Sequence, residues 1–368
     1  MMGKLWGHFL RQKRNVEIFR AYGWWDLVKQ SMTLPKDLYF GQGSASAPLN
    51  VALFITLRCN LRCKMCNLLE MLQEGKSLKE PTVEEVDKLC LELKEMGCPG
   101  LILFGGEPFV RQDFGLLVNI VKKHGLSCGS FTNGTLLDEN RIEEADGLDY
   151  LVYSLLGPRE IHSDITQNAK AYDKLIKSAK LVRERKKTNV IFHCTITKEN
   201  VQRLTEVVEL GKEIGVQLVR FGHPTFYTNK EWKRAQEHLE TAFSDQNASC
   251  TSARYEISSE ESILYLQSIK ELGAKYGSLV AFSTELSEEE LTRWYNPQFS
   301  TDRECFFAFR GSFIKPNGDV LPCESIDYPM GNAFAEGFTS VWRGPRYKNF
   351  RKKLRQGLFP ACARCCKL

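Results

Sequence analysis

The sequence has no apolar run long enough to cross a membrane as a helix. A spanning helix needs about 20 consecutive apolar residues, and the longest obvious run, Val51 to Leu57, has the length of a strand. The first residues contain Lys4 but neither the apolar stretch nor the small-residue cleavage site of a secretory signal. We therefore expect a cytoplasmic protein, in a compartment where disulfides are unlikely to form.

Acidic residues are absent from the stretch Val341 to Leu368, which contains many Lys and Arg residues. The whole chain has a formal net charge of only +5. A basic end of this kind suits an acidic protein, a phosphate-bearing substrate or a membrane surface. The simpler alternative is a solvated helix face. The modest overall charge gives no reason to expect nucleic acid as a partner.

An internal repeat is also missing, whereas the composition is that of an ordinary globular protein. Hydrophobic residues make up 43% and charged residues 26% of the 368 residues. This length exceeds one average domain, although α/β barrels often reach it as a single unit. We expect an ample hydrophobic core.

Apolar segments of strand length alternate with amphipathic helical stretches from residue 48 to residue 225. The expected strands are Val51–Leu57, Leu101–Phe104, Cys128–Thr132, Tyr150–Leu155, Val190–Thr195 and Val216–Phe221. The expected helices include Thr82–Met96, Phe114–His124, Ala171–Arg185 and Val201–Ile214. This alternation implies βαβ units and a parallel sheet. Six units predict the α/β class and a partial, TIM-like (β/α)6 barrel.

Three further segments flank this predicted barrel. Residues 1–47 form a basic, aromatic-rich leader, which suits an interfacial amphipathic helix or a helix packed on the main domain. Residues 226–300 read as a helical connecting region. Residues 301–368 are rich in cysteines and turns, and we expect them to form a separate small module.

Thirteen cysteines are many for a cytoplasmic chain, and they are not evenly spread. Clustered cysteines in a reducing compartment indicate metal ligands first. Scattered cysteines are usually small buried hydrophobic residues. The clustered ones are Cys59, Cys63 and Cys66, with Cys305, Cys323, Cys362, Cys365 and Cys366 towards the end of the chain.

Cys59, Cys63 and Cys66 directly follow the first expected strand, with the spacing CxxxCxxC. Closely spaced thiolates hold iron–sulfur clusters, and three ligands can bind three irons of a cubane while the fourth iron stays open. The alternative metal is zinc. A structural zinc site needs four ligands, however, and no fourth ligand lies nearby in the sequence.

A CxxxCxxC motif at the end of a first barrel strand resembles the signature of the radical S-adenosylmethionine (SAM) superfamily. The resemblance implies that SAM chelates the open iron of a [4Fe–4S] cluster through its amino and carboxylate groups. It also implies that one-electron reduction of SAM yields a 5′-deoxyadenosyl radical, which abstracts a substrate hydrogen. One departure is Met65, where the family commonly has an aromatic residue beside the adenine.

The segment Gly105-Gly106-Glu107-Pro108 follows the second expected strand and resembles the GGEP turn of this family. Glycines permit unusual backbone angles and close approach. The resemblance implies that the turn exposes its carbonyls and the Glu107 carboxylate to the ammonium of SAM. Without the cysteine motif before it, the same segment would be an ordinary turn.

Two later segments also resemble family motifs. Thr132-Asn133-Gly134 is similar to the TNG that follows the third strand, which implicates Asn133 in cofactor binding. Ser154 is similar to the serine of a common S-x-D-G-P segment, which lies close to SAM. Leu156 stands where that segment has an aspartate, so no substrate or ribose contact is carried over to it. His162, in the loosely similar continuation, receives no role.

The later cysteines form a second group. Cys305, Cys323, Cys362 and Cys365 follow the pattern C-x12-G-x4-C with a distant CxxC. Four thiolates can close one cluster or one zinc site. The pattern resembles the SPASM/twitch extension of radical SAM enzymes and implies an auxiliary [4Fe–4S] cluster in the shorter twitch form. Cys366 is the alternative to Cys365 as the fourth ligand.

The resemblance leaves the reaction open between oxidation (dehydrogenation) and epimerisation of a sugar-like or peptide natural product. An epimerase needs a thiol that returns hydrogen to the substrate. Cys194, expected at the barrel mouth, is the candidate donor and Cys250 the second, against the alternative of packed cysteines. A dehydrogenase needs a base, for which Tyr153, His193 and His223 are the candidates.

Two other classes of function stay open. One is a non-catalytic SAM or iron–sulfur scaffold, which would have no need of an open iron. The other is an enzyme acting on lipids at a membrane surface, with peripheral contact through the leader. The expected partners are a small-molecule or peptide substrate and a flavodoxin or ferredoxin reductant, which the basic end could dock.

Overall fold

The computed structural model describes residues 24–66, 79–244, 248–251, 253–254, 258–296, 299 and 301–368. Residues 1–23 of the predicted leader lie outside this described part. Within the described part, no helix has both the length and the apolar character needed to cross a membrane.

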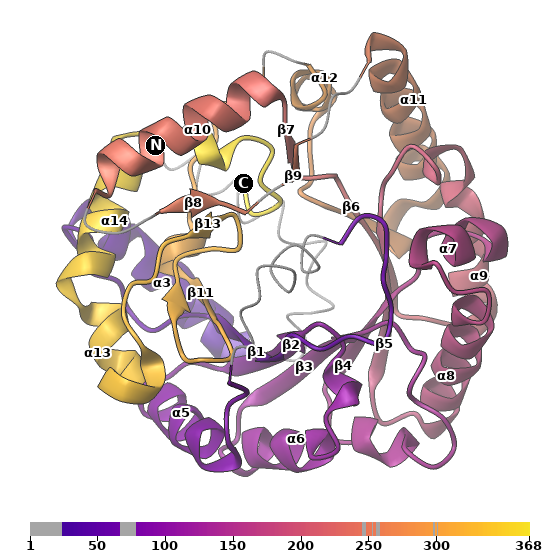
Figure 1. Cartoon of the computed structure of the whole chain (residues 1–368), viewed down its shortest axis with the longest axis horizontal. Helices are drawn as coiled ribbons and strands as arrows, with labels where there is room; N and C mark the ends of the chain where they lie inside the picture. Colours follow the sequence, from indigo (N-terminus) through magenta and orange to yellow (C-terminus); the bar gives the residue numbers. More distant parts are fainter. Residues whose placement is uncertain are drawn as a thin grey trace.

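A nine-stranded sheet forms the centre of the molecule, in the order β10-β6-β5-β4-β3-β2-β1-β11-β12. Neighbouring strands are parallel except β11 and β12. The six barrel strands are β1 (Asn50–Thr56), β2 (Gly100–Gly105), β3 (Ser127–Thr132), β4 (Tyr150–Ser154), β5 (Asn189–Thr195) and β6 (Leu218–Gly222). The predicted strands and the curved α/β architecture are confirmed, and Figure 1 shows the helices around the outside of the sheet.

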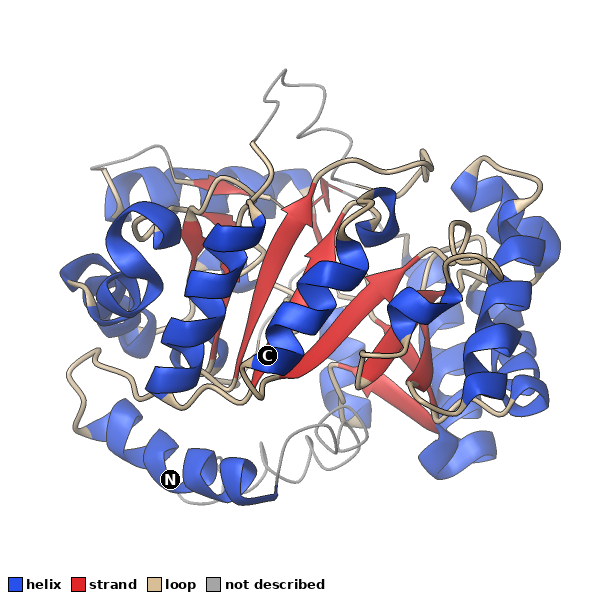
Figure 2. Cartoon of the chain, turned by 90° about the horizontal axis from the view of Figure 1, so that it is seen from below, coloured by secondary structure: helices blue, strands red, loops and turns tan. Residues whose placement is uncertain are grey.

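The helices between these strands cover the outer face of the sheet (Figure 2). They are α5 (Val83–Met96), α6 (Phe114–Lys123), α7 (Arg159–Thr166), α8 (Ala171–Arg185) and α9 (Leu204–Ile214), with the 3-10 turns η2 (Pro108–Val110), η3 (Ile142–Ala145) and η4 (Val201–Arg203). Local chemistry sets their ends. Thr82 and Glu85 form a capping box at the start of α5, and Gly97 ends it in the left-handed conformation.

The region 226–300 is less helical than the sequence indicates. It contains α10 (Asn229–Ala242), α11 (Ser259–Tyr276), η5 (Gly277–Leu279) and α12 (Glu288–Trp294), with the short strands β7 (Phe226–Tyr227), β8 (Ser249–Cys250) and β9 (Ala253–Arg254). It also contains β10 (Val280–Ser283), which pairs with β6 and adds a seventh parallel strand. The prediction missed β10 because its four residues follow a long polar helix without a turn signal.

The C-terminal segment is joined to the same sheet. It contains η6 (Phe307–Phe309), β11 (Gly311–Ile314), β12 (Val320–Leu321), β13 (Ile326–Asp327), η7 (Ala333–Gly337), α13 (Phe338–Arg343), α14 (Pro345–Gln356) and η8 (Pro360–Cys362). Because β11 pairs in parallel with β1, this segment continues the central sheet.

The described end of the leader packs on that C-terminal segment. It forms α3 (Trp24–Tyr39), whose buried Leu34 and Leu38 lie in one apolar cluster with Phe306 and Phe309. Asp37 pairs with Arg310 at 2.8 Å, and the side chains of both are largely buried. For this part of the leader, the interpretation as a helix packed on the main domain holds.

The basic end of the chain is partly internal. Arg351 is fully buried, and its guanidinium donates to the carbonyls of Ala308 (2.8 Å), Trp342 (2.9 Å) and Gly43 (3.3 Å). It also contacts the rings of Trp342 and Tyr347, at 4.1 and 3.9 Å from their centroids. One cation therefore joins the leader, η6 and the last two helices.

Replacing Arg351 by Ala should lower the free energy of unfolding by about 3 kcal/mol, since it removes hydrogen bonds from buried carbonyls and leaves a cavity beside the rings of Trp342 and Tyr347. The neighbouring Lys352, which is exposed, is the matched control. Its change to Ala should cost less than about 0.5 kcal/mol. Urea denaturation of the reconstituted protein measures both, and equal effects would contradict the role given to Arg351.

Candidate radical SAM site

The predicted site residues meet at one edge of the sheet. The cysteine motif follows β1, the GGEP turn follows β2, Asn133 follows β3 and Ser154 ends β4. The carboxyl ends of parallel strands share one edge, which is the usual place for ligands in α/β folds. The topology therefore brings together four segments that are far apart in the sequence.

Backbone hydrogen bonds hold the cysteine loop against the GGEP turn. The Gly106 N–H donates to the carbonyl of Thr56 at 3.0 Å, and the Glu107 N–H donates to that of Arg58 at 2.9 Å. A Cβ at Gly105 would lie 2.3 Å from the Thr56 oxygen, and one at Gly106 would lie 2.3 Å from the Arg58 oxygen. The two glycines are therefore required by close approach, as predicted from their type.

The Glu107 side chain is buried and has three hydrogen-bond donors. It accepts from the Thr132 hydroxyl at 2.8 Å and from the N–H groups of Asn133 at 2.7 Å and Phe109 at 3.3 Å. Burial raises the pKa of this carboxyl to about 7. A carboxylate offers about four acceptor positions, so Glu107 joins the β2 and β3 ends and retains one position for a further donor.

Asn133 reaches the cysteine loop itself. Its side-chain amide donates to the Asn60 oxygen at 3.0 Å and lies 3.9 Å from the Cys59 sulfur. Asn60 in turn donates to the Thr135 hydroxyl at 2.7 Å, and Thr135 donates to the Asn133 oxygen at 2.6 Å. Sequence reasoning missed Asn60 and Thr135, since polar residues inside loops carry no periodic signal.

A second contact holds the cysteine loop on its other side. The Lys64 N–H donates to the carbonyl of Ile165 in α7 at 2.9 Å, and its ammonium pairs with Asp164 at 2.5 Å. Cys59 and Cys63 are half-buried, whereas Cys66 is exposed. The loop is thus fixed between the β2 turn and α7, and its three thiols are not paired in disulfides.

The end of β4 is fixed by buried polar groups. Ser154 is half-buried at the strand end. His162 is fully buried, and its Nδ1 accepts the N–H of Leu156 at 3.1 Å, while burial lowers its pKa to about 4. Asn200 donates to the Leu156 carbonyl at 2.9 Å. At the position where the family pattern has an aspartate, this chain has a buried apolar side chain held by its backbone.

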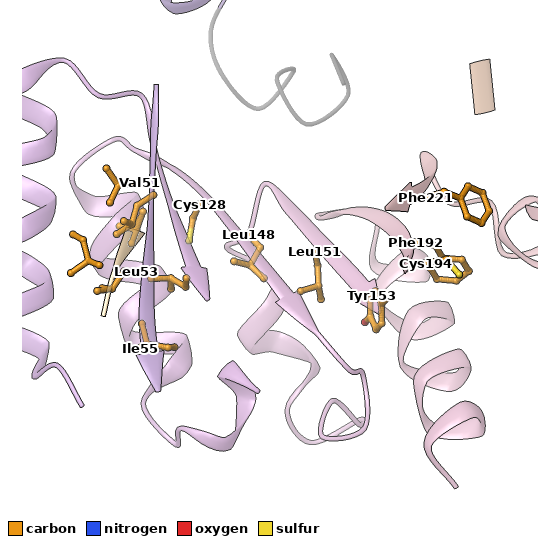
Figure 3. Close-up of a cluster of buried hydrophobic side chains, with 14 of the residues drawn as sticks. Val51, Leu53, Ile55, Cys128, Leu148, Leu151, Tyr153, Phe192, Cys194 and Phe221 are labelled. Carbon is orange, nitrogen blue, oxygen red and sulfur yellow. The ribbon is translucent and has the colours of Figure 1, made fainter. Parts of the chain in front are cut away.

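Cys194 does not point into the barrel, which corrects the predicted orientation. It is fully buried in the core between the sheet and the outer helices, on the same face as Tyr153, Phe192 and Phe221 (Figure 3). Its sulfur accepts from Asn200 at 3.5 Å. Alternation along β5 decides this placement, because successive side chains of a strand point to opposite faces. A hydrogen donor at the substrate cannot lie on this face.

The three candidate bases differ in the face of the sheet on which they lie and in their burial. The Tyr153 hydroxyl lies on the outer face and bonds Ser178 at 2.8 Å. His223 is buried, bonds the Tyr295 hydroxyl at 2.9 Å and has its pKa lowered by burial to about 3. His193 alternates with Cys194 and therefore points to the inner face. Of the three, His193 is the one on the barrel side of the sheet.

The second cysteine group gathers at the C-terminal segment. Burial raises the pKa of the Cys362 thiol well above its usual value, and the neighbouring thiols of Cys305, Cys323 and Cys250 raise it further. Cys250 reaches this group because β8 pairs with β13 opposite Ile326. The sequence treated Cys250 as a scattered cysteine, since its partner strand lies about seventy residues away along the chain.

Cys365 and Cys366, at the end of the chain, have different hydrogen-bond partners. Cys365 is buried and accepts from the Ser325 hydroxyl at 3.8 Å and from the Lys367 N–H at 3.5 Å. The Cys366 thiol instead donates to the Glu324 carboxylate at 2.8 Å. Glu324 and Ser325 directly follow Cys323, so the Cys365 and Cys366 thiols both contact the segment that contains Cys323.

Both cysteine groups have the donor chemistry of cubane clusters. No three Cys, His, Asp or Glu side chains of the described residues lie close enough together to bind a single metal ion. A cubane spreads its ligands more widely, because each thiolate binds a different iron.

Comparison with known proteins gives this arrangement a family. A model described as the radical SAM superfamily matches residues 53–211, and a model described as an iron–sulfur cluster-binding domain, SPASM, matches residues 305–366. The chain belongs to the radical SAM superfamily. Its cofactors are therefore SAM and [4Fe–4S] clusters, including an auxiliary cluster in the SPASM domain.

Curated relatives of this radical SAM protein have more than one substrate. The chain is 26% identical over 319 residues to a PqqA peptide cyclase of Gluconobacter oxydans, which covers 83% of this chain and 80% of that protein. It is 26% identical over 327 residues to an AdoMet-dependent heme synthase of Methanosarcina barkeri, which covers 83% of this chain and 85% of that protein.

Solved structures share the fold of this radical SAM protein. SuiB of Streptococcus suis matches with a TM-score of 0.61 at 17% identity, over 89% of this chain and 73% of that chain. An anSMEcpe structure with bound AdoMet matches with a TM-score of 0.56 at 18% identity, over 82% of this chain and 81% of that chain. At these identities, the likeness concerns the fold alone.

Replacing Gly106 by Ala should lower SAM cleavage about 100-fold, because the added Cβ would displace the Arg58 carbonyl and move the cysteine loop by a fraction of an ångström or more. Reductive formation of 5′-deoxyadenosine measures the effect. The control is Gly273 in α11, where a Cβ would make only an ordinary 3.7 Å contact with Phe282. Gly273→Ala should keep full activity. Full activity in Gly106→Ala as well would contradict the requirement for close approach at Gly106.

Proposed function

We propose that this chain is a radical SAM enzyme that abstracts a hydrogen atom from a peptide substrate and thereby oxidises or epimerises the peptide. The observation that carries the proposal is the cysteine loop, held between the GGEP turn and α7 at the open edge of the sheet. In this proposal Cys59, Cys63 and Cys66 hold the cluster that binds SAM. Bound SAM supplies the radical that takes the substrate hydrogen.

The chain's own residues then bind and orient this cofactor. We propose that SAM is bound by Gly105, Gly106, Glu107, Pro108, Asn133 and Ser154. Glu107 has one acceptor position left after its three hydrogen bonds, which suits the ammonium of SAM. Asn133 contacts both Glu107 and the Cys59 side of the loop, so it couples the SAM site to the cluster ligands.

Cys305, Cys323, Cys362 and Cys365 are the proposed ligands of the auxiliary cluster. The charges of Cys305 and Cys323 act on the Cys362 thiol, and Cys365 accepts from the hydroxyl of Ser325, two residues after Cys323. Cys366 is engaged by Glu324 and is left out of the set. The segment that contains these four cysteines includes β11, which pairs with β1, so the proposed ligands are joined to the same sheet as the SAM site.

Two observations favour a peptide as the substrate. The relative with the name PqqA peptide cyclase matches over most of both chains. SuiB, which shares the fold, has been solved with its precursor peptide SuiA. The second candidate is an iron porphyrin, favoured by the relatives named AdoMet-dependent heme synthase and Fe-coproporphyrin III synthase. A non-catalytic scaffold would not need a cysteine loop fixed this way.

Reconstituted protein should form 5′-deoxyadenosine from SAM under dithionite, and it should change the mass or deuterium content of members of a synthetic peptide library. Cys63→Ser should abolish both, because a cubane without that thiolate is labile. Cys90→Ala, at a fully buried cysteine of the outer-face core, is the control and should retain both. SAM cleavage without any change in the peptides would contradict the peptide substrate. A complete absence of SAM cleavage would contradict the proposal that the chain is an enzyme.

Iron and sulfide analysis should give about eight irons per chain, the content of two cubanes. Cys305→Ser should reduce this to about four, since one of the two clusters loses a ligand. Cys90→Ala should leave the content unchanged. About four irons together with one zinc in the unmodified protein would contradict the auxiliary cluster and favour a structural zinc site.

A further inference from the structure

The inner face of the sheet is less buried than the outer face. Its lowest layer is a buried apolar cluster of Tyr150, Val152, Ile191, Leu218 and Ala281. Above that layer, the inner side chains are only half-buried, although they belong to central strands. They are Phe54, Ile102, Phe104, Phe131, His193 and Arg220. The outer face of the same strands is fully buried, so solvent reaches this sheet from the barrel side.

Arg220 is the cation on this inner face. Its Nε donates to Nδ1 of His193 at 3.1 Å, and its guanidinium lies 5.6 Å from the ring centroid of Phe131. Within the described part of the chain, no carboxylate lies within ion-pair distance of it. A cation in such an environment normally has an anionic partner. Among the described residues, no hydrogen bond uses the remaining guanidinium N–H groups of Arg220, so these groups can bind an anionic partner.

His193 adds a second donor to this position. Since its Nδ1 accepts from Arg220, the neutral ring carries its proton on Nε2. Burial keeps the ring neutral by holding its pKa well below the usual value, and the charges of Arg220 and Lys367 act in the same direction. The pair therefore offers N–H donors and no acceptor of its own to an incoming group.

Lys367 brings another positive charge from the C-terminal segment. Its ammonium lies 5.6 and 5.9 Å from the ring centroids of Phe307 and Phe313. Glu324 is the nearby acid, but it lies 3.7 Å from Lys367 and accepts the Cys366 thiol. Glu324 offsets part of the positive charge of Lys367 and Arg220, since its charge also acts on Arg220.

We propose that Arg220, together with the Nε2–H of His193 and with Lys367, binds a carboxylate of the substrate on the inner face of the sheet. The planar fork of an arginine matches a carboxylate through two parallel hydrogen bonds. The surrounding phenylalanines suit the apolar remainder of an organic substrate.

The place of this carboxylate site fits the reaction. His193 is the register partner of Ser154, which ends β4 at the SAM edge. Lys367 comes from the segment that contains the second cysteine group. A substrate anchored at Arg220 therefore lies between the two cysteine groups. This inference rests on the proposed function, of which it names the substrate chemistry.

Equilibrium binding to reconstituted protein tests the site without turnover. The probes are acetyl-Gly-Glu-Gly-amide and its Gln counterpart, which differ only in the carboxylate. We expect the Glu probe to bind at least about tenfold more tightly, and Arg220→Gln to remove this preference, because charge-assisted hydrogen bonds are lost. Arg220→Lys keeps the charge and should restore part of it. Arg203→Gln, at an exposed arginine paired with Glu206, should bind like the unmodified protein.

A second arm uses iron coproporphyrin and its methyl ester, since porphyrin propionates present the same group. Preference for the acid that depends on Arg220 would place the carboxylate on a porphyrin instead of a peptide. Equal binding of acid and neutral probes, or binding unchanged in Arg220→Gln with normal iron content, would overturn the proposal. Arg220-dependent binding without peptide turnover would overturn the peptide substrate but not the site. Peptide turnover with an unchanged KM in Arg220→Gln would overturn the carboxylate site but not the peptide substrate.

Discussion

The cofactor site depends on the close backbone contact between the end of β1 and the turn after β2. Two hydrogen bonds, from Gly106 to Thr56 and from Glu107 to Arg58, place the first cysteine of the loop against the GGEP turn. Only glycine fits there, because any Cβ would meet a carbonyl oxygen. Glu107, fixed by this contact, then orients Asn133, which reaches the Cys59 sulfur.

The position of β1 in the sheet extends this constraint to the whole molecule. It pairs with β2 on one side and with β11 on the other, so the SAM edge and the C-terminal cysteine segment share one strand. Arg351 and the Asp37–Arg310 pair fasten the leader helix α3 and the last helices to that segment. Two sites that are separated by more than two hundred residues are thereby held in one rigid framework.

The open inner face gives this framework a function of its own. Apolar side chains form one layer of it, and above that layer the ring of Phe131 lies 5.6 Å from the Arg220 guanidinium, which bonds His193. Such a surface combines few polar groups with a large apolar area, which is the usual character of an organic ligand site. The glycines of the GGEP turn shape the SAM site, whereas side chains of the strands line the proposed substrate site. The residues of the two sites can therefore change independently.

The sequence by itself determined the six barrel strands, their helices and the cysteine motifs, because apolar periodicity and residue spacing are local properties. It also indicated that the glycines of GGEP serve a close approach. Only the tertiary structure decided which face each strand residue occupies, and this moved Cys194 into the outer core and His193 to the barrel side. It likewise joined β10 and β11 to the sheet and brought Cys250 beside Cys362, since pairing between distant segments leaves no trace in local sequence.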